Sequence, residues 1–548
     1  MRRSADACKR WGAIALILGA MVAPALPSHA AAAAAGRTFY LSATGSDAAD
    51  GRATTTAWRT LSRANRETLG PGDRLLLQGG ARFTGPLVIS ASGTAEQPLV
   101  VGSYGTGRAI VAGNGDSGIF VWNAGGIVIQ DLTVIGDAGA YTRVGGISIY
   151  LDKARTTRVP YLRIARVEVS GFKNGIDIGT MVSGAGFQDV LIESVLAHDN
   201  RDTGVLVYGP PFGPAGGAYA HADVRVRSVN AYRNLGDPQN LTANTGSGIV
   251  LGSVDGGVIA DSTAYENGSQ CRAPEGPYGI WAYDSRRITI ERNIAYRNRT
   301  GASIDGGGFD LDQNVGSSVL QHNLSYSNDG PGIMVYTGRA NDLNTGNTVR
   351  FNISVDDARG AGDYGAMTIA GRISDAAIYH NTIVSTRHPV LQLATGPRRT
   401  VIANNVFVAL GAVPVVKANG LTTGETRLTG NTYYGRVSGP LLLWGTGAYT
   451  SVAVWRTATG QEADGAGFDG DPRLQDVTAV PTVTVPAQRS AVTQYTLRSD
   501  SPLAAARTTS TFTLPSGIAD YFGATLGVTR SAWAGASQPG PLAVAAPA

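Results

Sequence analysis

Two aspartates separated by one residue, Asp310 and Asp312, lie in an apolar segment that follows three consecutive glycines. In a β-strand, residues i and i+2 point to the same face and lie ~6.6 Å apart. One carboxyl group of such a pair can protonate a leaving oxygen while the other activates water or attacks carbon, which is the chemistry of glycoside cleavage. Repulsion between the two charges would raise one pKa and keep a proton available at neutral pH.

Aromatic residues occupy matching positions in the segments on either side of this pair. If the apolar residues Ile280, Phe309 and Ile333 point inward, their neighbours point outward. The two outward rows are then Trp281, Asp310 and Met334, followed by Tyr283, Asp312 and Tyr336. Because aromatic rings stack on the apolar faces of sugars, we interpret this surface as a substrate groove.

The predicted catalytic residues are therefore Asp310 and Asp312, acting as acid and as base or nucleophile. We expect substrate to be bound by Trp281, Tyr283, Asp284, Glu275, Tyr336 and Arg339. Asp305, which precedes the glycine run, is a further acid that could join the pair. The spacing lies between the ranges of retaining and inverting enzymes, so it predicts no stereochemical outcome.

Three other interpretations of the same residues stay open. Outward aspartate pairs are common on solvated strands, and exposed tyrosines are common on protein surfaces. Asp310 and Asp312 could instead bind Ca²⁺, which prefers hard oxygen ligands. We assign no metal ligand and expect no required cofactor, with Ca²⁺ kept as an alternative.

An internal repeat predicts the fold that would position these residues. An aromatic residue or His, any residue and then Asn recur at steps of 26 to 34 residues, with the Asn at positions 174, 200, 234, 267, 298 and 328. Asn and Gly tolerate the left-handed backbone of a sharp turn, and stacked Asn side chains can bond to one another. Asn352, Asn381 and Asn405 are expected at comparable positions of later coils.

A second pattern follows each of these turns: Gly, an apolar residue, any residue and another apolar residue, as in Gly308 to Leu311. Such units are strands with alternating faces, and none can bury its apolar face alone. The predicted fold is all-β, a right-handed parallel β-helix of coils of roughly thirty residues.

The ends of the chain differ from its middle. We predict a signal peptide over 1–30, an N-terminal cap and first strands over 31–115, the β-helix over 116–435 and C-terminal capping strands with a tail over 436–548. The signal peptide is predicted from a basic start, an apolar run too short to span a membrane, and Ser28-His29-Ala30. A short amphipathic helix is expected from Trp58 to Thr68, over the open end of the core.

Composition argues against nucleic-acid binding and against an internal disulfide. Charged residues are 16% of the chain and the net charge of +4 is not gathered in a basic block, so nucleic-acid binding has no support. Gly is 73 of 548 residues, as expected for many turns between short strands. Without the signal peptide only Cys271 remains, so no internal disulfide can form. We expect a monomer, secreted to the extracellular space or periplasm, with no membrane segment after signal cleavage.

Several segments resemble the pectate-lyase-like superfamily of right-handed β-helix proteins. The segments are Tyr40-Leu41-Ser42, Gly45-Ser46-Asp47, Trp58-Arg59-Thr60-Leu61, Pro71-Gly72-Asp73, Ser92-Gly93-Thr94 and Gly306 to Asp312, with weaker similarity at Ser501 to Ala504 and Asp520 to Gly523. The resemblance spans about residues 37 to 435. It implies an extracellular polysaccharide as substrate, acted on by hydrolysis, elimination or epimerisation. The chain lacks the Gly-His-Gly of polygalacturonases and the Asp-Pro-His of alginate epimerases.

Three hypotheses for function follow. The first is a glycoside hydrolase that uses Asp310 and Asp312. The second is a polysaccharide lyase, which would need a uronic-acid substrate and charge neutralisation by Ca²⁺ or Arg. The third is a non-catalytic carbohydrate-binding solenoid.

Overall fold

The structure is a computed structural model. It describes residues 36–136, 144–212, 217–301, 304–338, 343–360, 362–420, 425–437, 439, 441–505, 508–509, 514–526, 531–532 and 534–537. The predicted signal peptide over 1–30 lies outside these residues. Among the described residues, no helix is long and apolar enough to cross a membrane.

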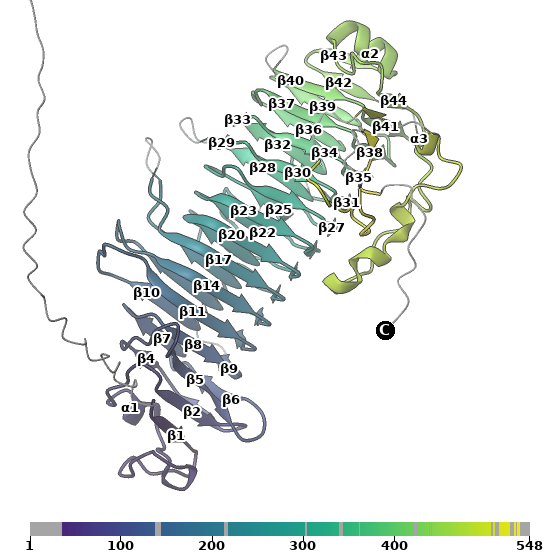
Figure 1. The fold of residues 1–548 in the computed structure, drawn as a ribbon. Helices are drawn as coiled ribbons and strands as arrows, with labels where there is room; N and C mark the ends of the chain where they lie inside the picture. Colours follow the sequence, from purple (N-terminus) through teal and green to yellow (C-terminus); the bar gives the residue numbers. More distant parts are fainter. Residues whose placement is uncertain are drawn as a thin grey trace, which may run out of the picture. The chain divides into compact units, whose positions relative to one another are not determined.

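Three 14-stranded sheets make up the fold, and the chain visits them in turn (Figure 1). Sheet A runs from β1 (Thr38–Leu41) to β40 (Thr426–Thr429), and sheet B from β3 (Arg82–Thr84) to β44 (Phe468–Asp469). Sheet C, which carries the site, consists of β4 (Leu87–Ile89), β7 (Ile119–Trp122), β10 (Ile147–Leu151), β13 (Ile176–Thr180), β16 (Val205–Tyr208), β19 (Ile249–Gly252), β22 (Tyr278–Tyr283), β25 (Gly307–Leu311), β28 (Ile333–Thr337), β32 (Met367–Gly371), β36 (Leu391–Ala394), β39 (Val416–Asn419), β42 (Leu442–Trp444) and β43 (Gly447–Tyr449). Strands in these sheets pair in parallel, with an antiparallel pair at β42 and β43. The predicted parallel β-helix is confirmed, and its sheets extend beyond 116–435 at both ends.

The core forms because every second side chain of each strand points into the coil. In β22, β25 and β28 the residues Ile280, Phe309 and Ile333 are in register and fully buried in one cluster that continues through the coils. No coil could bury this surface alone, so each is stabilised by its neighbours.

The repeated Asn residues form a ladder at the corner between sheets B and C. Asn200, Asn234, Asn267, Asn298 and Asn328 are stacked, and each donates from its side-chain amide to the Oδ1 of the next at 2.9–3.0 Å as far as Asn328. Asn328 donates to Asp357 at 2.8 Å, which ends the ladder. Asn174, predicted to share this position, does not join the stack, because Ser170 pairs with His198 and Phe172 therefore stands opposite Asn200 and donates its backbone N–H to Asn200 Oδ1.

We predicted a left-handed backbone at the Asn of these turns. Instead, the residue before the Asn is left-handed. Asp199, Arg233, Glu266, Arg297 and Ser327 have φ of 50 to 58°. The preceding aromatic rings stack outside sheet B, from His198 on Tyr232 to Tyr296 on Tyr326, with centroids 4.7 to 5.0 Å apart. In each repeat, the first residue stacks its ring, the second makes the left-handed turn, and the third, the Asn, joins the ladder.

A second ladder lies at the corner between sheets A and B. Its members are Asn293, Asn323, Asn352, Asn381, Asn405 and Asn431, and it ends on Glu462. Asn352, Asn381 and Asn405, which we predicted to continue the first series, belong here. Before them, the rings of His322, Phe351 and His380 stack at centroid distances of 5.6 and 5.2 Å.

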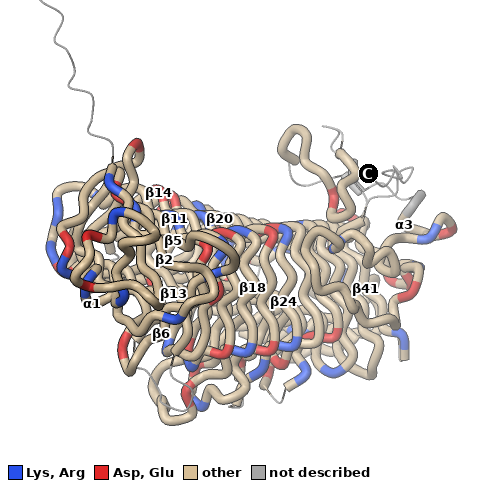
Figure 2. Tube along the Cα trace, turned by 90° about the horizontal axis from the view of Figure 1, so that it is seen from below, with Lys and Arg blue, Asp and Glu red and all other residues tan. Residues whose placement is uncertain are grey.

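Charged residues gather in rows along the stacked turns, with both signs present (Figure 2). Ion pairs join neighbouring coils there, such as Asp131 with Arg166 at 2.7 Å and Asp375 with Arg399 at 2.7 Å. Because acids and bases alternate, these rows form no basic stripe of the kind that binds nucleic acid.

Both ends of the core are covered by helices. The N-terminal helix α1 spans Leu61–Ala64, shorter than the predicted Trp58 to Thr68, because Trp58 pairs with Leu41 as an extended residue and Thr60 caps the helix. At the other end α2 (Val452–Thr459) begins at the cap Ser451 and buries Trp455 in the core.

The segment after β44 runs along the outer face of sheet B and includes α3 (Pro502–Ala505) (Figure 1). Tyr495 and Tyr521 pack there against outward residues such as Tyr326. Hydrogen bonds fix the path, including one that the side-chain hydroxyl of Tyr326 donates to Val483 O at 3.1 Å.

Candidate functional site

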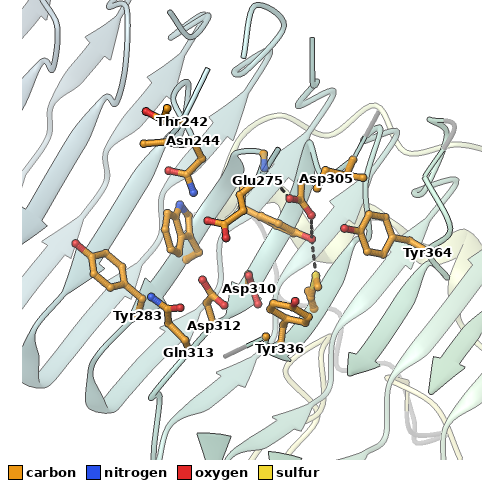
Figure 3. A pocket seen from close by; sticks show the side chains of 17 residues that line it. Thr242, Asn244, Glu275, Tyr283, Asp305, Asp310, Asp312, Gln313, Tyr336 and Tyr364 are labelled. Atoms are coloured by element: carbon orange, nitrogen blue, oxygen red, sulfur yellow. Dashed lines mark hydrogen bonds between the residues drawn. The ribbon is translucent and has the colours of Figure 1, made fainter. Parts of the chain in front are cut away.

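The site lies on the outer face of sheet C, over β22, β25 and β28. The register pairs Trp281 with Asp310 and Asp310 with Met334, as the alternation predicted. Asp312 follows β25 but keeps the strand pairing, since its backbone N–H donates to Ala282 O at 3.0 Å. In Figure 3, Tyr283 and Tyr336 lie on opposite sides of Asp312.

These residues form the floor of a cleft of about 460 Å³. Its sides are loops that rise before β19, β22, β25 and β32. The lining consists of Thr242, Ala243, Asn244, Glu275, Gly276, Tyr278, Trp281, Tyr283, Ile304, Asp305, Asp310, Asp312, Gln313, Met334, Tyr336, Gly338 and Tyr364. The cleft therefore combines carboxyl groups with several aromatic rings (Figure 3).

Asp310 points outward but is almost fully covered, with 4% of its surface exposed. Tyr278, Trp281 and Met334 form an apolar cluster on this face, separate from the solenoid core. The Oδ1 of Asp310 has no hydrogen-bond partner among the described residues. Burial, followed by repulsion from Asp312 and Asp305, raises the pKa of Asp310 well above its usual range.

Asp312 is half-buried and faces the same cleft. Burial raises the pKa of Asp312 to about 7, with smaller contributions from the charges of Asp305, Glu275 and Asp284, while a hydrogen bond from the Gln313 backbone opposes the rise. The two carboxyl groups therefore differ in proton affinity, and Asp312 loses its proton first as the pH rises.

A third carboxyl group, Asp305, joins the cleft from the loop before β25. Its Oδ2 accepts from Gly276 N at 2.7 Å and its Oδ1 from Tyr278 Oη at 3.3 Å. Burial raises the pKa of Asp305, and the hydroxyl of Tyr364 lowers it. With its oxygens occupied, Asp305 fixes the loops around the cleft, in contrast to Asp310.

The aromatic side chains of the cleft differ in how much of their ring surface is exposed. Tyr336 is 36% exposed and Tyr283 is half-buried. Trp281 is 8% exposed and donates from Nε1 to Ser247 Oγ at 3.0 Å. Its centroid lies 5.3 Å from that of Tyr283, so Trp281 supports the floor on which Tyr283 rests.

The structure brings together most of the residues that we predicted from the sequence. Asp310, Asp312, Trp281, Tyr283, Tyr336 and Glu275 all line the cleft, and Glu275 is exposed. Asp284 does not line it; this buried residue accepts from Phe212 N at 3.1 Å and Asn314 Nδ2 at 2.7 Å, and so holds two loops together. Arg339 lies outside the described residues.

Sequence reasoning missed Tyr278 and Tyr364 among the lining residues, as well as Thr242 and Asn244. Tyr278 begins β22 and could have been found by extending the strand alternation backward from Ile280. Tyr364 and the residues of the 242–244 loop have no repeat signal, because loops between strands vary in length from coil to coil.

The described part of the lining holds four carboxyl groups and no Lys, Arg or His. Among the described residues, no three or more His, Cys, Asp or Glu side chains are grouped closely enough to hold a metal ion. The residues present thus offer proton transfer and ring stacking.

Comparison with known proteins supports the fold. The family model described as the right-handed β-helix region matches residues 117–353. Together with the three parallel sheets, this match establishes the right-handed parallel β-helix expected from the resemblance to pectate-lyase-like proteins. No curated protein sequence matches the chain.

Several solved structures are similar to the chain at low sequence identity. A GH136 lacto-N-biosidase from Eubacterium ramulus has a TM-score of 0.47 at 16% identity, covering 72% of this chain and 68% of that one. The pectate lyase Pel9A has a TM-score of 0.38 at 16% identity, covering 90% and 96%. An alginate lyase from a Paenibacillus species has a TM-score of 0.32 at 18% identity, covering 65% and 97%. The activities in these names belong to those proteins.

Proposed function

We propose that this protein is a carbohydrate-active enzyme, a glycoside hydrolase that cleaves a neutral polysaccharide in the cleft over β22, β25 and β28. The observation that carries the proposal is the environment of Asp310. Its Oδ1 is buried and unpartnered, it stands two residues from Asp312, and both face an aromatic cleft. An unsatisfied buried carboxyl group is destabilising, and a substrate oxygen would supply the missing partner.

The two carboxyl groups take different roles in this reaction. Asp310, whose pKa is raised further, stays protonated at neutral pH and donates its proton to the glycosidic oxygen as that bond breaks. Asp312, ionised above about pH 7, either removes a proton from the attacking water or attacks the anomeric carbon itself. After cleavage, the proton from water returns the pair to its starting state.

The aromatic residues hold the sugar for this step. Tyr336 and Tyr283 lie on either side of Asp312 and offer ring surface for stacking, while Trp281 and Tyr278 exclude water from Asp310. Water exclusion raises the pKa of Asp310 and strengthens its hydrogen bond to the leaving oxygen.

The charge of the cleft favours a hydrolase over a lyase. Elimination on a uronic-acid polymer needs cationic groups that neutralise the substrate carboxylate, and the described lining has none. The carboxyl groups of the cleft that are ionised would instead repel such a polymer. A lyase assisted by Ca²⁺ and a non-catalytic binder remain the alternatives that the experiment must separate. We further propose that the enzyme acts outside the cell or in the periplasm, without a required cofactor.

A panel of polysaccharides tests this proposal. Purified protein without residues 1–30 is incubated with neutral and acidic polymers, and both reducing ends and ultraviolet absorbance are recorded. Hydrolysis raises reducing ends without a new absorbance, whereas elimination produces an absorbing unsaturated product. Asp310→Asn and Asp312→Asn should each lower kcat by at least about a hundredfold.

Asp177→Asn is the matched control. Asp177 is also buried and outward on sheet C, but its Oδ1 is bonded to Ser148 Oγ at 2.6 Å. This variant should keep kcat. Full activity of the Asp310→Asn and Asp312→Asn variants would contradict the site assignment, and an absorbing product would contradict the reaction.

A further inference from the structure

The outer face of sheet C carries a line of aromatic residues on the N-terminal side of the cleft. The strand register places Trp122, Tyr150, Gly179 and Tyr208 in one row, and Gly252 and Tyr283 in register at its continuation. Asp312 is the next member of this row. The line therefore leads directly into the cleft, and Tyr283 belongs to both.

Two glycines in the row provide seats for tyrosine rings. A Cβ on Gly179 would lie 2.3 to 2.5 Å from three ring atoms of Tyr208, and a Cβ on Gly252 would lie 2.3 Å from Cζ of Tyr283. Each ring thus lies over the glycine of the preceding coil. Any other residue at these positions would push the ring off the sheet.

Tyr208 and Tyr283 are two strands apart, ~9.6 Å, since neighbouring parallel strands lie ~4.8 Å apart. One strand spacing is close to the length of one pyranose unit in an extended chain. Both side chains are half-buried and Trp122 is 40% exposed, so ring surface is open along the row.

The groove is closed on the C-terminal side of the acid pair. The segment Asp363–Gly365 lies across sheet C: Asp363 accepts from Gln392 Nε2 at 3.0 Å through its carbonyl and from Lys417 Nζ at 2.6 Å through its carboxylate. Gly365 packs so tightly that a Cβ would lie 2.9 Å from Gln392. The outward side chain of Thr368 is 1% exposed beneath this strap.

The two sides of the acid pair therefore differ. Toward the strap the open floor ends between β28 and β32, because the strap covers Thr368 on β32, and about one to two strand spacings or ~5 to 10 Å remain. On the other side half-buried or exposed rings continue through Tyr208 and Tyr150 to Trp122 on β7, six strand spacings from β25, ~29 Å.

We propose that a linear neutral polysaccharide lies along sheet C, with its long arm on Trp122, Tyr150, Tyr208 and Tyr283 and its end against the strap 363–365. Cleavage at Asp310 and Asp312 then releases a product of one or two sugars, and the remaining chain stays on the aromatic row. This inference rests on the proposed function for cleavage, but the aromatic row binds sugar whether or not cleavage occurs.

Binding is tested with a protein that cannot cleave. The Asp310→Asn/Asp312→Asn double variant is run in gels that contain xylan, glucomannan, galactan or mixed-linkage β-glucan, with polygalacturonate and alginate as acidic comparators. We expect a neutral polymer to retard the protein. Adding Tyr208→Ala should weaken retardation about threefold to tenfold, and Tyr232→Ala, on the outer face of sheet B, should not. Trp122→Ala, at an exposed position, repeats the test where loss of folding cannot explain the result.

Binding of oligosaccharides of increasing length, prepared from the polymer that retards the protein, then tests how far the aromatic row lies from the acid pair. Tyr208 is three strand spacings from Asp310, so Tyr208→Ala should weaken binding of chains longer than about three units and leave shorter ones unchanged. Equal effects at every length, retardation only by acidic polymers, or no retardation at all would overturn the aromatic row.

The size of the products released by the wild-type protein tests whether the strap 363–365 closes one end of the groove. Mono- or disaccharides should accumulate from the start while the viscosity of the polymer falls slowly. A rapid fall in viscosity with products of all lengths would overturn the role of the strap. If the double variant binds as expected and the wild type cleaves no polymer, the row stands and the proposed hydrolase activity is wrong.

Discussion

Asp312→Asn should make the protein more stable at neutral pH than the wild type, by an amount that depends on pH. The pKa of Asp312 is about 7 in the folded protein, against about 3.9 for an unfolded aspartate. Between these two values the folded state binds more protons than the unfolded state, so the wild type loses stability as the pH rises from about 4 to about 7. The asparagine does not titrate, so the variant lacks this loss.

The magnitude follows from the shift. About three pKa units at 1.36 kcal/mol each correspond to ~4 kcal/mol over the full window, and to ~3 kcal/mol between about pH 4.5 and about pH 8. Urea unfolding followed by tryptophan fluorescence measures the difference in unfolding free energy between wild type and variant at each pH. We expect this difference to shift toward the variant as the pH rises.

Asp116→Asn is the control, because Asp116 is exposed in a turn of an early coil. Its difference from the wild type provides the baseline at each pH. If the Asp312→Asn difference did not change with pH relative to this baseline, the raised pKa of Asp312 would be wrong. The assignment of Asp312 as the group that ionises near neutral pH would then be wrong, whatever substrate the enzyme cleaves.

Three further predictions concern activity and folding. The pH profile of kcat/KM should rise with a midpoint near pH 7, as Asp312 ionises, and fall at higher pH as Asp310 loses its proton; a profile already flat at pH 5 would contradict these roles. Asn323→Ala should lower the free energy of unfolding by about 2 to 4 kcal/mol, because the amide of Asn293 loses its acceptor, and urea unfolding should show a lower midpoint. Trp455→Ala should cost about 3 to 5 kcal/mol by opening the C-terminal end of the core, measured in the same way, and an unchanged midpoint would show that α2 is not a cap.

The repeat allowed much of the fold to be predicted, because β-helix coils impose the same demand at each turn. The alternation of apolar residues placed Ile280, Phe309 and Ile333 inward and Asp310 outward, and the strand register agrees. The assignment of all Asn residues to one series failed because two corners of the coil use the same residue for the same purpose. Sequence spacing alone does not distinguish a ladder between sheets A and B from one between sheets B and C.

Most site residues on or directly after the strands were predicted from the sequence, and most of those on loops were not. Asp310 and Asp312 were found because strand geometry fixes which side chains share a face. The strap at Asp363–Gly365 and the Thr242–Asn244 wall were not, since loops follow no period and their direction depends on contacts far along the chain. Asp284 was misleading for the same reason. It directly follows β22, but its backbone is left-handed, with φ of 44°, and its carboxylate accepts hydrogen bonds from Phe212 and Asn314, outside the cleft lining.

The Asn ladders have a direction. Between side chains, each Asn amide donates to the Oδ1 of the coil that follows it, so a ladder must finish on a group that accepts this bond without passing one on. Asp357 and Glu462 meet that requirement. A coil can therefore be inserted or removed within a ladder without leaving an unpaired amide, provided that the terminal acid stays last. Duplicating a coil within a ladder therefore keeps every ladder amide paired, and the two acids mark where each ladder ends, while the sheets continue past Asp357.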